Sequence, residues 1–371
     1  NTRLPAGFSS ERALQHSEDY VHFLFNKDND LYYYCRTSGV HKRLTDTPAP
    51  EQTPAFSPDY RHVAYTREHN LYVVDVATAV EKQLTRDGSE VVLNGYNSWV
   101  YYEEVYDRSY RAFWWSPNSA RIAFARYDDS PVPIFTLCRA DGIHGQLETA
   151  RYPKAGDPNP LVKFGLVDVQ NGTLSWIGLD EKADHYIACP FWSRDSRQLF
   201  IQWMNRGQDR LVIYAVDAAT AAFKAVYEER QNSWVDFFSD VRVLKNGFIL
   251  RSDKSGWSHL YYYDLAGALR STLTAGEWAV KNIVHVDETD GMVYFLAARS
   301  ASTETELCRV RLNGKRLAKI TPEPGNHAVK LSSTASYIID TYSSIQQPAR
   351  MLLRGRNRSE EHTSELQSPN T

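Results

Sequence analysis

A strand pattern that recurs along the chain constrains its fold more than any other feature of the sequence. In each copy a leucine precedes a run of tyrosines, valines or other strand formers, and a short segment ending in Leu-Thr follows after a turn. Copies begin at Leu31, Leu71 and Leu260, and a weaker one runs from Leu307 to Thr321. The first two copies start 40 residues apart, which is the period of a four-stranded propeller blade.

A second pattern precedes some of these strands and predicts tight turns. It consists of an aromatic residue, Ser, Pro or Arg, and then Asp or Asn, and it occurs at Phe56–Asp59, Trp115–Asn118 and Trp192–Asp195. Pro fixes φ and the Asp or Asn side chain caps the turn. We expect successive residues of the strands that follow to point to alternate sides, as in half-buried antiparallel strands. We therefore expect an all-β fold, a β-propeller of four-stranded antiparallel blades. Two sandwiches are the alternative, but sandwiches do not repeat a blade motif.

Composition excludes several classes of function. The chain has 371 residues and a net charge of −3, so it lacks the excess of basic residues that is typical of nucleic-acid-binding proteins. No stretch approaches the roughly 18 consecutive apolar residues of a membrane span. The four cysteines are isolated, and no His or Cys spacing resembles a metal site. We expect no metal and no cofactor. The chain begins with Asn1 rather than Met, so we expect the natural N-terminus to be absent and leave the localisation open.

The strongest candidate for a binding site is the adjacent pair Glu103 and Glu104, which lies in the aromatic-rich run Trp99–Trp115. Two neighbouring carboxylates repel each other, and burial penalises each charge. A protonated amine relieves both costs, because its three N–H donors can be shared between two carboxylates. The alternative is a solvated Glu pair beside aromatic residues that pack in a core. The spacing alone leaves both interpretations open.

The final residues do not continue the pattern. From Arg358 onwards the sequence is polar and shows no strand periodicity. It resembles a translated sequencing adapter joined to a truncated gene, and a natural disordered tail is the alternative. We expect one propeller domain over residues 1–353 and a non-native, disordered tail over residues 354–371.

The chain resembles the N-terminal β-propeller of the dipeptidyl peptidase IV family of prolyl-oligopeptidase-like serine peptidases. The resemblance covers roughly Ser10 to Leu353, and the segments that carry it are Asn94–Val105, Ala112–Pro117, Tyr152–Pro160, Lys163–Asp168 and Ser255–Tyr261. It implies eight blades, with those at the ends of this chain incomplete, and a C-terminal α/β-hydrolase domain beside the propeller. It also implies that Glu103 and Glu104 bind the free N-terminal amine of a peptide. The family commonly has a third acidic residue before this pair, where Tyr102 stands here.

The implied activity is release of dipeptides whose second residue is Pro or Ala. An amine clamp fixes the distance from the N-terminus to the scissile bond, so a remote group orients the reacting carbonyl. Phe238 is the candidate for a wall of the second subsite, with a core strand aromatic as the alternative. The substrate-binding Arg of the family cannot be placed, although Arg108 and Arg111 lie nearby in sequence. The resemblance further implies a homodimer of the intact protein and favours a periplasmic or secreted location.

The catalytic residues of a serine peptidase are not found in the sequence. The nucleophile needs a Gly-x-Ser-x-Gly elbow, and Gly256-Trp257-Ser258 matches only its first three positions before His259 and a blade strand. We therefore assign no catalytic residue, expect the triad to lie in the hydrolase domain, and expect this chain alone to be inactive. A non-catalytic propeller that serves as a binding scaffold is the alternative.

Overall fold

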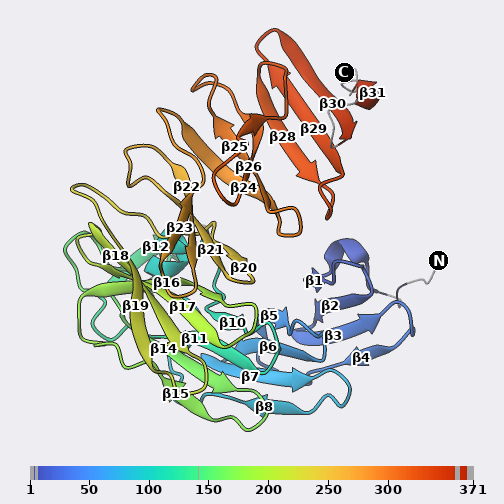
Figure 1. Cartoon of the computed structure of the whole chain (residues 1–371). Coiled ribbons are helices and arrows are strands. Elements are labelled where there is room, and N and C mark those ends of the chain that lie inside the picture. The colour runs from blue at the N-terminus through green and yellow to red at the C-terminus, as the bar shows by residue number, and fades with distance from the viewer. Residues whose placement is uncertain (1–3, 5–6, 141, 356–359, 366–371) are drawn as a thin grey trace. The chain divides into compact units, whose positions relative to one another are not determined.

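The computed structural model describes residue 4, residues 7–140 and 142–355, and the backbone of residues 360–365. Nearly all its regular structure is antiparallel β-sheet (Figure 1). The chain divides into two compact units. Unit 1 comprises Asn1–Arg206 and Val216–Lys224, and unit 2 comprises Gly207–Ala215 and Ala225–Thr371.

Unit 1 contains two four-stranded sheets, a five-stranded sheet and a two-stranded hairpin. The first sheet has the order β1-β2-β3-β4 (Gln15–His16, His22–Lys27, Asp30–Cys35, His41–Arg43). The second has the order β5-β6-β7-β8 (Gln52–Phe56, His62–Arg67, Asn70–Asp75, Glu81–Gln83). The third has the order β10-β11-β14-β15 (Phe113–Trp115, Arg121–Asp128, Leu161–Asp168, Leu174–Trp176), and β9 (Val92–Asn94) also pairs with β11. The hairpin is formed by β12 (Ile134–Arg139) and β13 (Gln146–Arg151).

Another sheet has the order β16-β17-β18-β19 (His185–Trp192, Gln198–Asn205, Arg210–Asp217, Phe223–Arg230), and the division into units passes through β18 and β19. Unit 2 then has the sheet β20-β21-β22-β23 (Arg242–Leu244, Gly247–Ser252, His259–Asp264, Leu269–Thr272). The sheet β24-β25-β26-β27 follows (Ala279–Asp287, Met292–Ala298, Glu306–Arg311, Ala318–Lys319). The last sheet is β28-β29-β30-β31 (Asn326–Leu331, Tyr337–Ser344, Gln347–Gly355, Glu360–Glu365).

The expected all-β fold of four-stranded antiparallel sheets, as in a β-propeller, is confirmed. Eight blades were expected, and the described residues form seven sheets of four or five strands together with the β12–β13 hairpin. Helix is confined there to η1 (Ser10–Arg12) and η2 (Tyr101–Val105), and neither is long enough to cross a membrane. The expected disordered tail falls on residues 356–359 and 366–371, which lie outside the described residues, and on β31, whose backbone pairs with β30. The non-native origin of the tail stays a prediction.

The Leu-Thr repeat is explained by one hydrogen bond that occurs in four sheets. The threonine hydroxyl accepts the backbone N–H of a leucine 14 residues earlier, at distances of 2.8–3.0 Å. The pairs are Leu31 and Thr45, Leu71 and Thr85, Leu260 and Thr274, and Leu307 and Thr321. The residue before each threonine also donates its N–H to the carbonyl of that leucine. Both groups are buried, so each bond satisfies a donor that water cannot reach.

The Ser-turn repeat closes a hairpin and links it to the next sheet. In the second sheet the hydroxyl of Ser57 donates to Asp59 at 2.6 Å and accepts the N–H of His62 at 3.0 Å. The N–H of Asp59 in turn donates to the hydroxyl of Ser119, in the corresponding turn of the third sheet. Ser116 and Ser193 repeat the arrangement within their own turns. The sequence pattern missed two further copies, at Ser17 and Ser332.

The core lies between the faces of successive sheets. In unit 1, Leu24 and Leu31 of the first sheet pack with Val63 and Val74 of the second. The opposite face of the second sheet, which includes Leu71, packs against the third. Because the inner strands are covered on both faces, they form continuous apolar runs such as Leu71–Val74.

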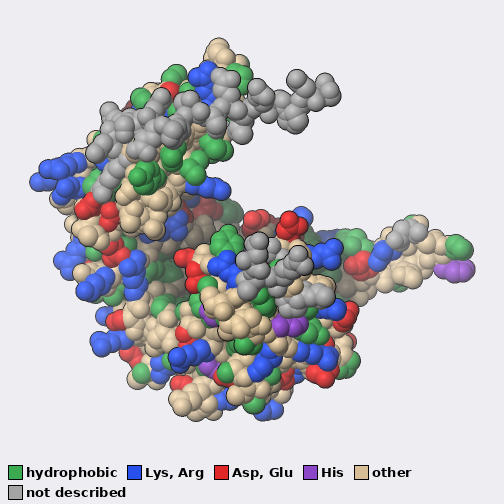
Figure 2. All heavy atoms as spheres, turned by 90° about the vertical axis from the view of Figure 1, so that its right-hand side faces the viewer, with side chains coloured by type: hydrophobic (Ala, Val, Ile, Leu, Met, Phe, Trp, Pro, Cys, Tyr) green, Lys and Arg blue, Asp and Glu red, His purple; other side chains and the backbone are tan. Residues whose placement is uncertain are grey.

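The β12–β13 hairpin departs from this arrangement. It is inserted between β11 and β14, which pair directly from Arg121↔Asp168 to Asp128↔Leu161. Most of its side chains are exposed, including Ile134 and Leu147. Figure 2 shows one face of the molecule, on which Lys and Arg side chains are interspersed with those of Asp and Glu.

Replacing Thr85 by Val tests the repeated hydrogen bond, because the two side chains have similar shapes. The buried N–H of Leu71 loses its acceptor, so we expect the free energy of unfolding to fall by about 1–3 kcal/mol in urea denaturation. The matched change at the exposed Thr289 should alter it by less than about 0.5 kcal/mol. Equal effects at the two positions would contradict the assigned role.

Candidate functional site

Glu103 and Glu104 lie on η2, a single turn of π-helix in unit 1. The N–H of Tyr106 donates to the carbonyl of Tyr101, five residues earlier, at 3.0 Å. The N–H of Tyr102 donates to the carbonyl of Ser98 at 2.9 Å. Isolated π-turns are rare and occur frequently at functional sites. The turn places both carboxylates on one short, well-defined piece of backbone.

Two tyrosine hydroxyl groups anchor this turn to β16. The hydroxyl of Tyr101 accepts the N–H of Ile187 at 3.3 Å, and that of Tyr106 accepts the N–H of Cys189 at 3.0 Å. The pairing of β16 with β17 is irregular here, and Cys189 has a φ of 47°. Burial raises the pKa of both tyrosines well above the ordinary value, so both hydroxyls stay neutral. Cys189 lies within the irregularity, whereas Ile187 pairs regularly with Trp203 on β16, which is the edge strand of its sheet.

The buried side chain of Asn97 ties together the two ends of the segment that carries η2. Its Nδ2 donates to the carbonyl of Ser109 at 2.8 Å, and its Oδ1 accepts the hydroxyl of Tyr127 at 2.9 Å. The segment is therefore closed at its base and does not behave as a free loop. Asp129 contributes to the same support, since its carboxyl group is hydrogen bonded by Ser98.

The two glutamates differ in their surroundings. The Glu103 side chain is 30% exposed, and its Oε1 accepts a hydrogen bond from Nη2 of Arg108 at 3.0 Å. The Arg108 side chain is itself 72% exposed, so water competes for this ion pair. Glu104 is exposed and has no hydrogen-bond or ion-pair partner among the described residues. The pair thus offers one partly satisfied carboxylate and one free carboxylate to a cation.

The aromatic residues around the pair divide into two groups. Tyr102 and Tyr110 stack with ring centroids 3.8 Å apart, and Trp99 lies 5.8 Å from Tyr102 and remains 37% exposed. Trp114 and Trp115 belong to β10 and are half-buried, with Trp114 stacked on Phe164 of β14. The first group frames the glutamates, and the second is part of the sheet.

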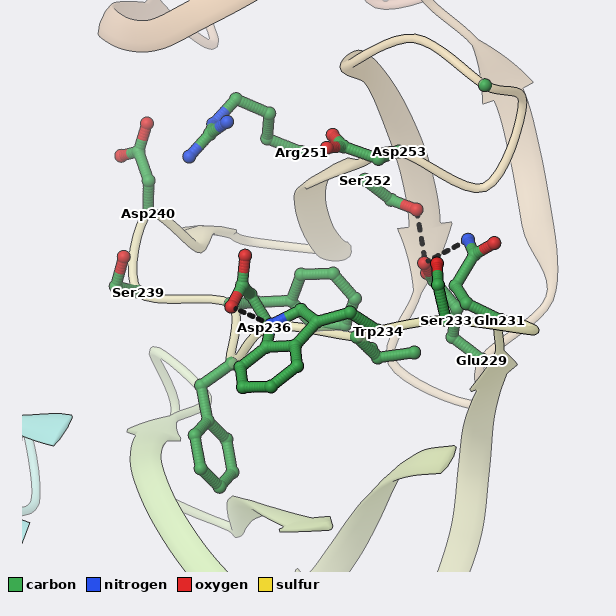
Figure 3. A pocket seen from close by; sticks show the side chains of 14 residues that line it. Glu229, Gln231, Ser233, Trp234, Asp236, Ser239, Asp240, Arg251, Ser252 and Asp253 are labelled. Carbon is green, nitrogen blue, oxygen red and sulfur yellow. Dashed lines mark hydrogen bonds between the residues drawn. The ribbon is translucent and has the colours of Figure 1, made fainter. Parts of the chain in front are cut away.

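Phe238, the other predicted site residue, belongs to unit 2. Its ring is 8% exposed and meets the ring of Tyr227 edge-on at 5.7 Å. It lines a cavity of about 380 Å³ together with Trp234 and Asp236 (Figure 3). Nε1 of Trp234 donates to Oδ1 of Asp236 at 2.6 Å, and Trp234 remains 57% exposed. Phe238 lies in the loop between β19 and β20, where its ring packs against Tyr227 and also forms a wall of the cavity.

The geometry around Ser258 is that of a structural residue. Its hydroxyl accepts a hydrogen bond from Nη1 of Arg251 at 3.0 Å. The neighbouring His259 is buried and bonded to Thr274 and to the carbonyl of Gly276. Among the described residues no three His, Cys, Asp or Glu side chains gather as a metal site requires.

Sequence reasoning missed the residues that hold the pair in place. Arg108 reaches Glu103 because Asp107 and Arg108 both have positive φ, 46° and 63°, which no sequence pattern announces. The roles of Tyr101 and Tyr106 depend on β16, more than 80 residues later. An inspection of the tyrosines that flank the glutamates could have suggested anchors, but it could not have named their partners.

Tyr106→Phe tests the anchoring of the turn. The N–H of Cys189 loses its acceptor, so we expect the free energy of unfolding to fall by about 1–3 kcal/mol. The same change at Tyr337, which is 50% exposed, should have almost no effect on the free energy of unfolding. A Tyr106→Phe chain as stable as the Tyr337→Phe chain would mean that the hydroxyl does not anchor η2.

The stability of the chain should depend on pH through Asp129. Burial raises the pKa of its carboxyl group from 3.8 to about 6, so between these values the folded state keeps a proton that the unfolded state releases. The free energy of unfolding therefore falls as pH rises from about 4 to 6, by up to about 3 kcal/mol in total. Above that range Asp129 causes no further change with pH. Asp129→Asn removes this penalty, so its stability relative to the natural chain should rise over the same interval. Denaturation at several pH values measures this difference, with Asp28→Asn, at an exposed position, as the matched control.

Comparison with known proteins identifies the family. Residues 8–349 match the profile described as the dipeptidyl peptidase IV (DPP IV) N-terminal region. A probable dipeptidyl peptidase 4 of Aspergillus fumigatus is 30% identical over 278 residues, which cover 70% of this chain and 36% of the relative. A probable dipeptidyl-aminopeptidase B of Emericella nidulans is 32% identical over 290 residues, covering 70% of this chain and 32% of the relative.

Solved structures agree. The crystal structure of Porphyromonas gingivalis dipeptidyl peptidase 4 matches 96% of this chain with a TM-score of 0.86 at 28% identity, over 54% of its own length. A putative dipeptidyl aminopeptidase IV from Bacteroides ovatus has the same fold, with a TM-score of 0.74 at 22% identity, over 92% of this chain and 50% of its own. The chain spans about a third of the length of the Aspergillus and Emericella relatives and about half of the length of the two solved chains. From the match over residues 8–349 and the shared fold, we conclude that the chain belongs to the dipeptidyl peptidase IV family and corresponds to the N-terminal region of that family.

Proposed function

We propose that this chain is the substrate-gating propeller of a serine dipeptidyl peptidase, in which Glu103 and Glu104 bind the α-ammonium group of a peptide. The observation that carries the proposal is the pair of adjacent carboxylates on an anchored π-turn, one of them exposed and without a partner among the described residues. An ammonium group has three N–H donors and can bond to both carboxylates. The names of the relatives support the type of reaction.

The clamp would set the length of the product. A peptide held by its N-terminal ammonium group presents its carbonyl groups at fixed distances from the glutamates. A nucleophile at one such distance cleaves after one residue only, here the second. This is catalysis by positioning, because binding at a remote group orients the reacting carbonyl.

Arg108 would respond to substrate. In the structure its guanidinium group occupies one oxygen of Glu103, and its exposed side chain can withdraw into water at little cost. An arriving ammonium group therefore exchanges with an existing cation at Glu103 and fills an empty position at Glu104. Glu103 thus exchanges one positive partner for another, and Glu104 gains a positive partner that it lacks in the free chain.

The proposal places the reacting groups outside these 371 residues. The sequence contains no Gly-x-Ser-x-Gly elbow, and the hydroxyl of Ser258 is bonded to Arg251. A catalytic Ser, Asp and His would lie in a C-terminal α/β-hydrolase domain, and cleavage after Pro or Ala would follow from its pocket. Phe238 is the proposed wall of the second subsite, supported by its position on the cavity of Figure 3. The chain alone should not hydrolyse an Ala-Pro reporter.

Single substitutions of the glutamates in the complete enzyme test the clamp. Glu103→Ala or Glu104→Ala removes one hydrogen bond to a charged group, worth about 1.5–3 kcal/mol, so kcat/KM for Ala-Pro substrates should fall roughly tenfold to a few hundredfold. An N-acetylated substrate offers no cation, and its slow turnover should be unchanged in both variants. Glu277→Ala, at an exposed position, serves as the charge-matched control.

The substrate comparison separates the possible outcomes. Equal losses on free and acetylated substrates would show that the glutamates act through folding. No loss on either substrate would show that they are a solvated pair without a role in binding.

A further inference from the structure

A second, basic cavity lies in unit 2, on the sheet β24–β27. It has a volume of about 360 Å³, and three arginines line it, Arg309, Arg311 and Arg316. The remaining lining residues are Asp290, Met292, Leu317 and Ala318. Three guanidinium groups therefore face a single carboxylate.

Strand geometry brings the arginines together. Arg309 and Arg311 are two positions apart on β26, so their side chains leave the same face about 6.6 Å apart. The N–H of Arg311 donates to the carbonyl of Lys315 at 2.9 Å, which closes the turn that leads to Arg316. Arg316 has a φ of 61°, a conformation that non-glycine residues seldom adopt. The convergence is thus built into a strand and a hydrogen-bonded turn.

The cavity and its surroundings contain donors that lack acceptors. Nε of Arg311 is buried and has no hydrogen-bond partner, and none of the three arginine side chains has an ion pair among the described residues. The hydroxyl of Tyr294 is also buried and unpartnered. Tyr294 lies directly opposite Arg309 across β25 and β26, so the two side chains share a face. Buried donors without partners are costly and call for a missing acceptor.

We propose that this cavity is a binding site for a doubly charged tetrahedral oxyanion, phosphate or sulfate. A guanidinium group presents paired N–H donors that match two oxygens of such an ion. Arg309 and Arg311 would donate hydrogen bonds to the anion from β26, and Arg316 would donate from the turn after β26. The apolar side chains of Met292 and Leu317 flank the site and strengthen the attraction by excluding water. This site is independent of the amine clamp in unit 1.

A solvated basic surface would look similar but would behave differently. Exposed arginines attract any anion weakly, and chloride competes with sulfate according to ionic strength alone. A specific site with preorganised donors binds one anion in preference to another according to the shape and charge of the ion. The test must therefore compare anions at constant ionic strength.

Isothermal titration of the 371-residue chain with sodium sulfate and with sodium phosphate provides this comparison, with sodium chloride as the reference. We expect one ion bound per chain for sulfate or phosphate and no saturable heat for chloride. Arg311→Ala should weaken binding at least tenfold, and Arg311→Lys should weaken it by less because it keeps the charge and loses only the paired donors. Lys224→Ala removes the same charge at an exposed position in unit 1 and should change the affinity less than twofold.

Folding is monitored separately by thermal unfolding of each variant without added anion. In addition, sulfate should raise the melting temperature of the natural chain more than that of Arg309→Ala. The proposal is wrong if neither ion binds saturably, if chloride at matched ionic strength gives the same effect, or if folded Arg311→Ala binds as tightly as the natural chain.

Discussion

Side-chain hydroxyl groups that accept hydrogen bonds from backbone N–H groups hold this structure together where the strand ladders end. Threonines perform this task at the outer strands, as Thr85 does for Leu71, and serines do so in the turns, as Ser57 does for His62. Tyr101 and Tyr106 do the same for Ile187 and Cys189 of the edge strand β16. Sheets that pack face to face leave little room for water, so each N–H at a ladder end needs a partner from the protein. The candidate site uses the same device as the scaffold.

The sequence predicted those parts of the fold that depend on local chemistry. Leu-Thr and Ser-Pro-Asp mark real hydrogen bonds, which is why the sheets could be expected before their arrangement was known. Ser17 was missed because His precedes it and Glu follows it, and Ser332 because no Asp or Asn follows two positions later. The expectation of eight blades came from the family resemblance, and the repeats alone could not give the number of sheets because insertions such as β12–β13 interrupt their spacing.

The site was predictable to a lesser degree. The adjacency of Glu103 and Glu104 is visible in the sequence, and so is their aromatic setting. The sequence does not show that the two glutamates differ in their partners. This difference depends on Arg108, which reaches Glu103 because Asp107 and Arg108 have positive φ. Two neighbouring carboxylates, one of which is already ion-paired, cost less to keep folded than two bare charges, since the ion pair offsets part of their mutual repulsion. The asymmetry is therefore consistent with a site that must stay folded while empty.

The insertion of the β12–β13 hairpin has a consequence for how such a chain can change. Asp128 and Leu161 are cross-strand partners, so residues 129–160 leave the sheet and return to it at adjacent positions. Whatever lies between them can vary in length without shifting the register of β11 against β14. This edge of the sheet is thus a natural splice point, at which recombination can exchange one appendage for another while the sheets beneath keep their packing.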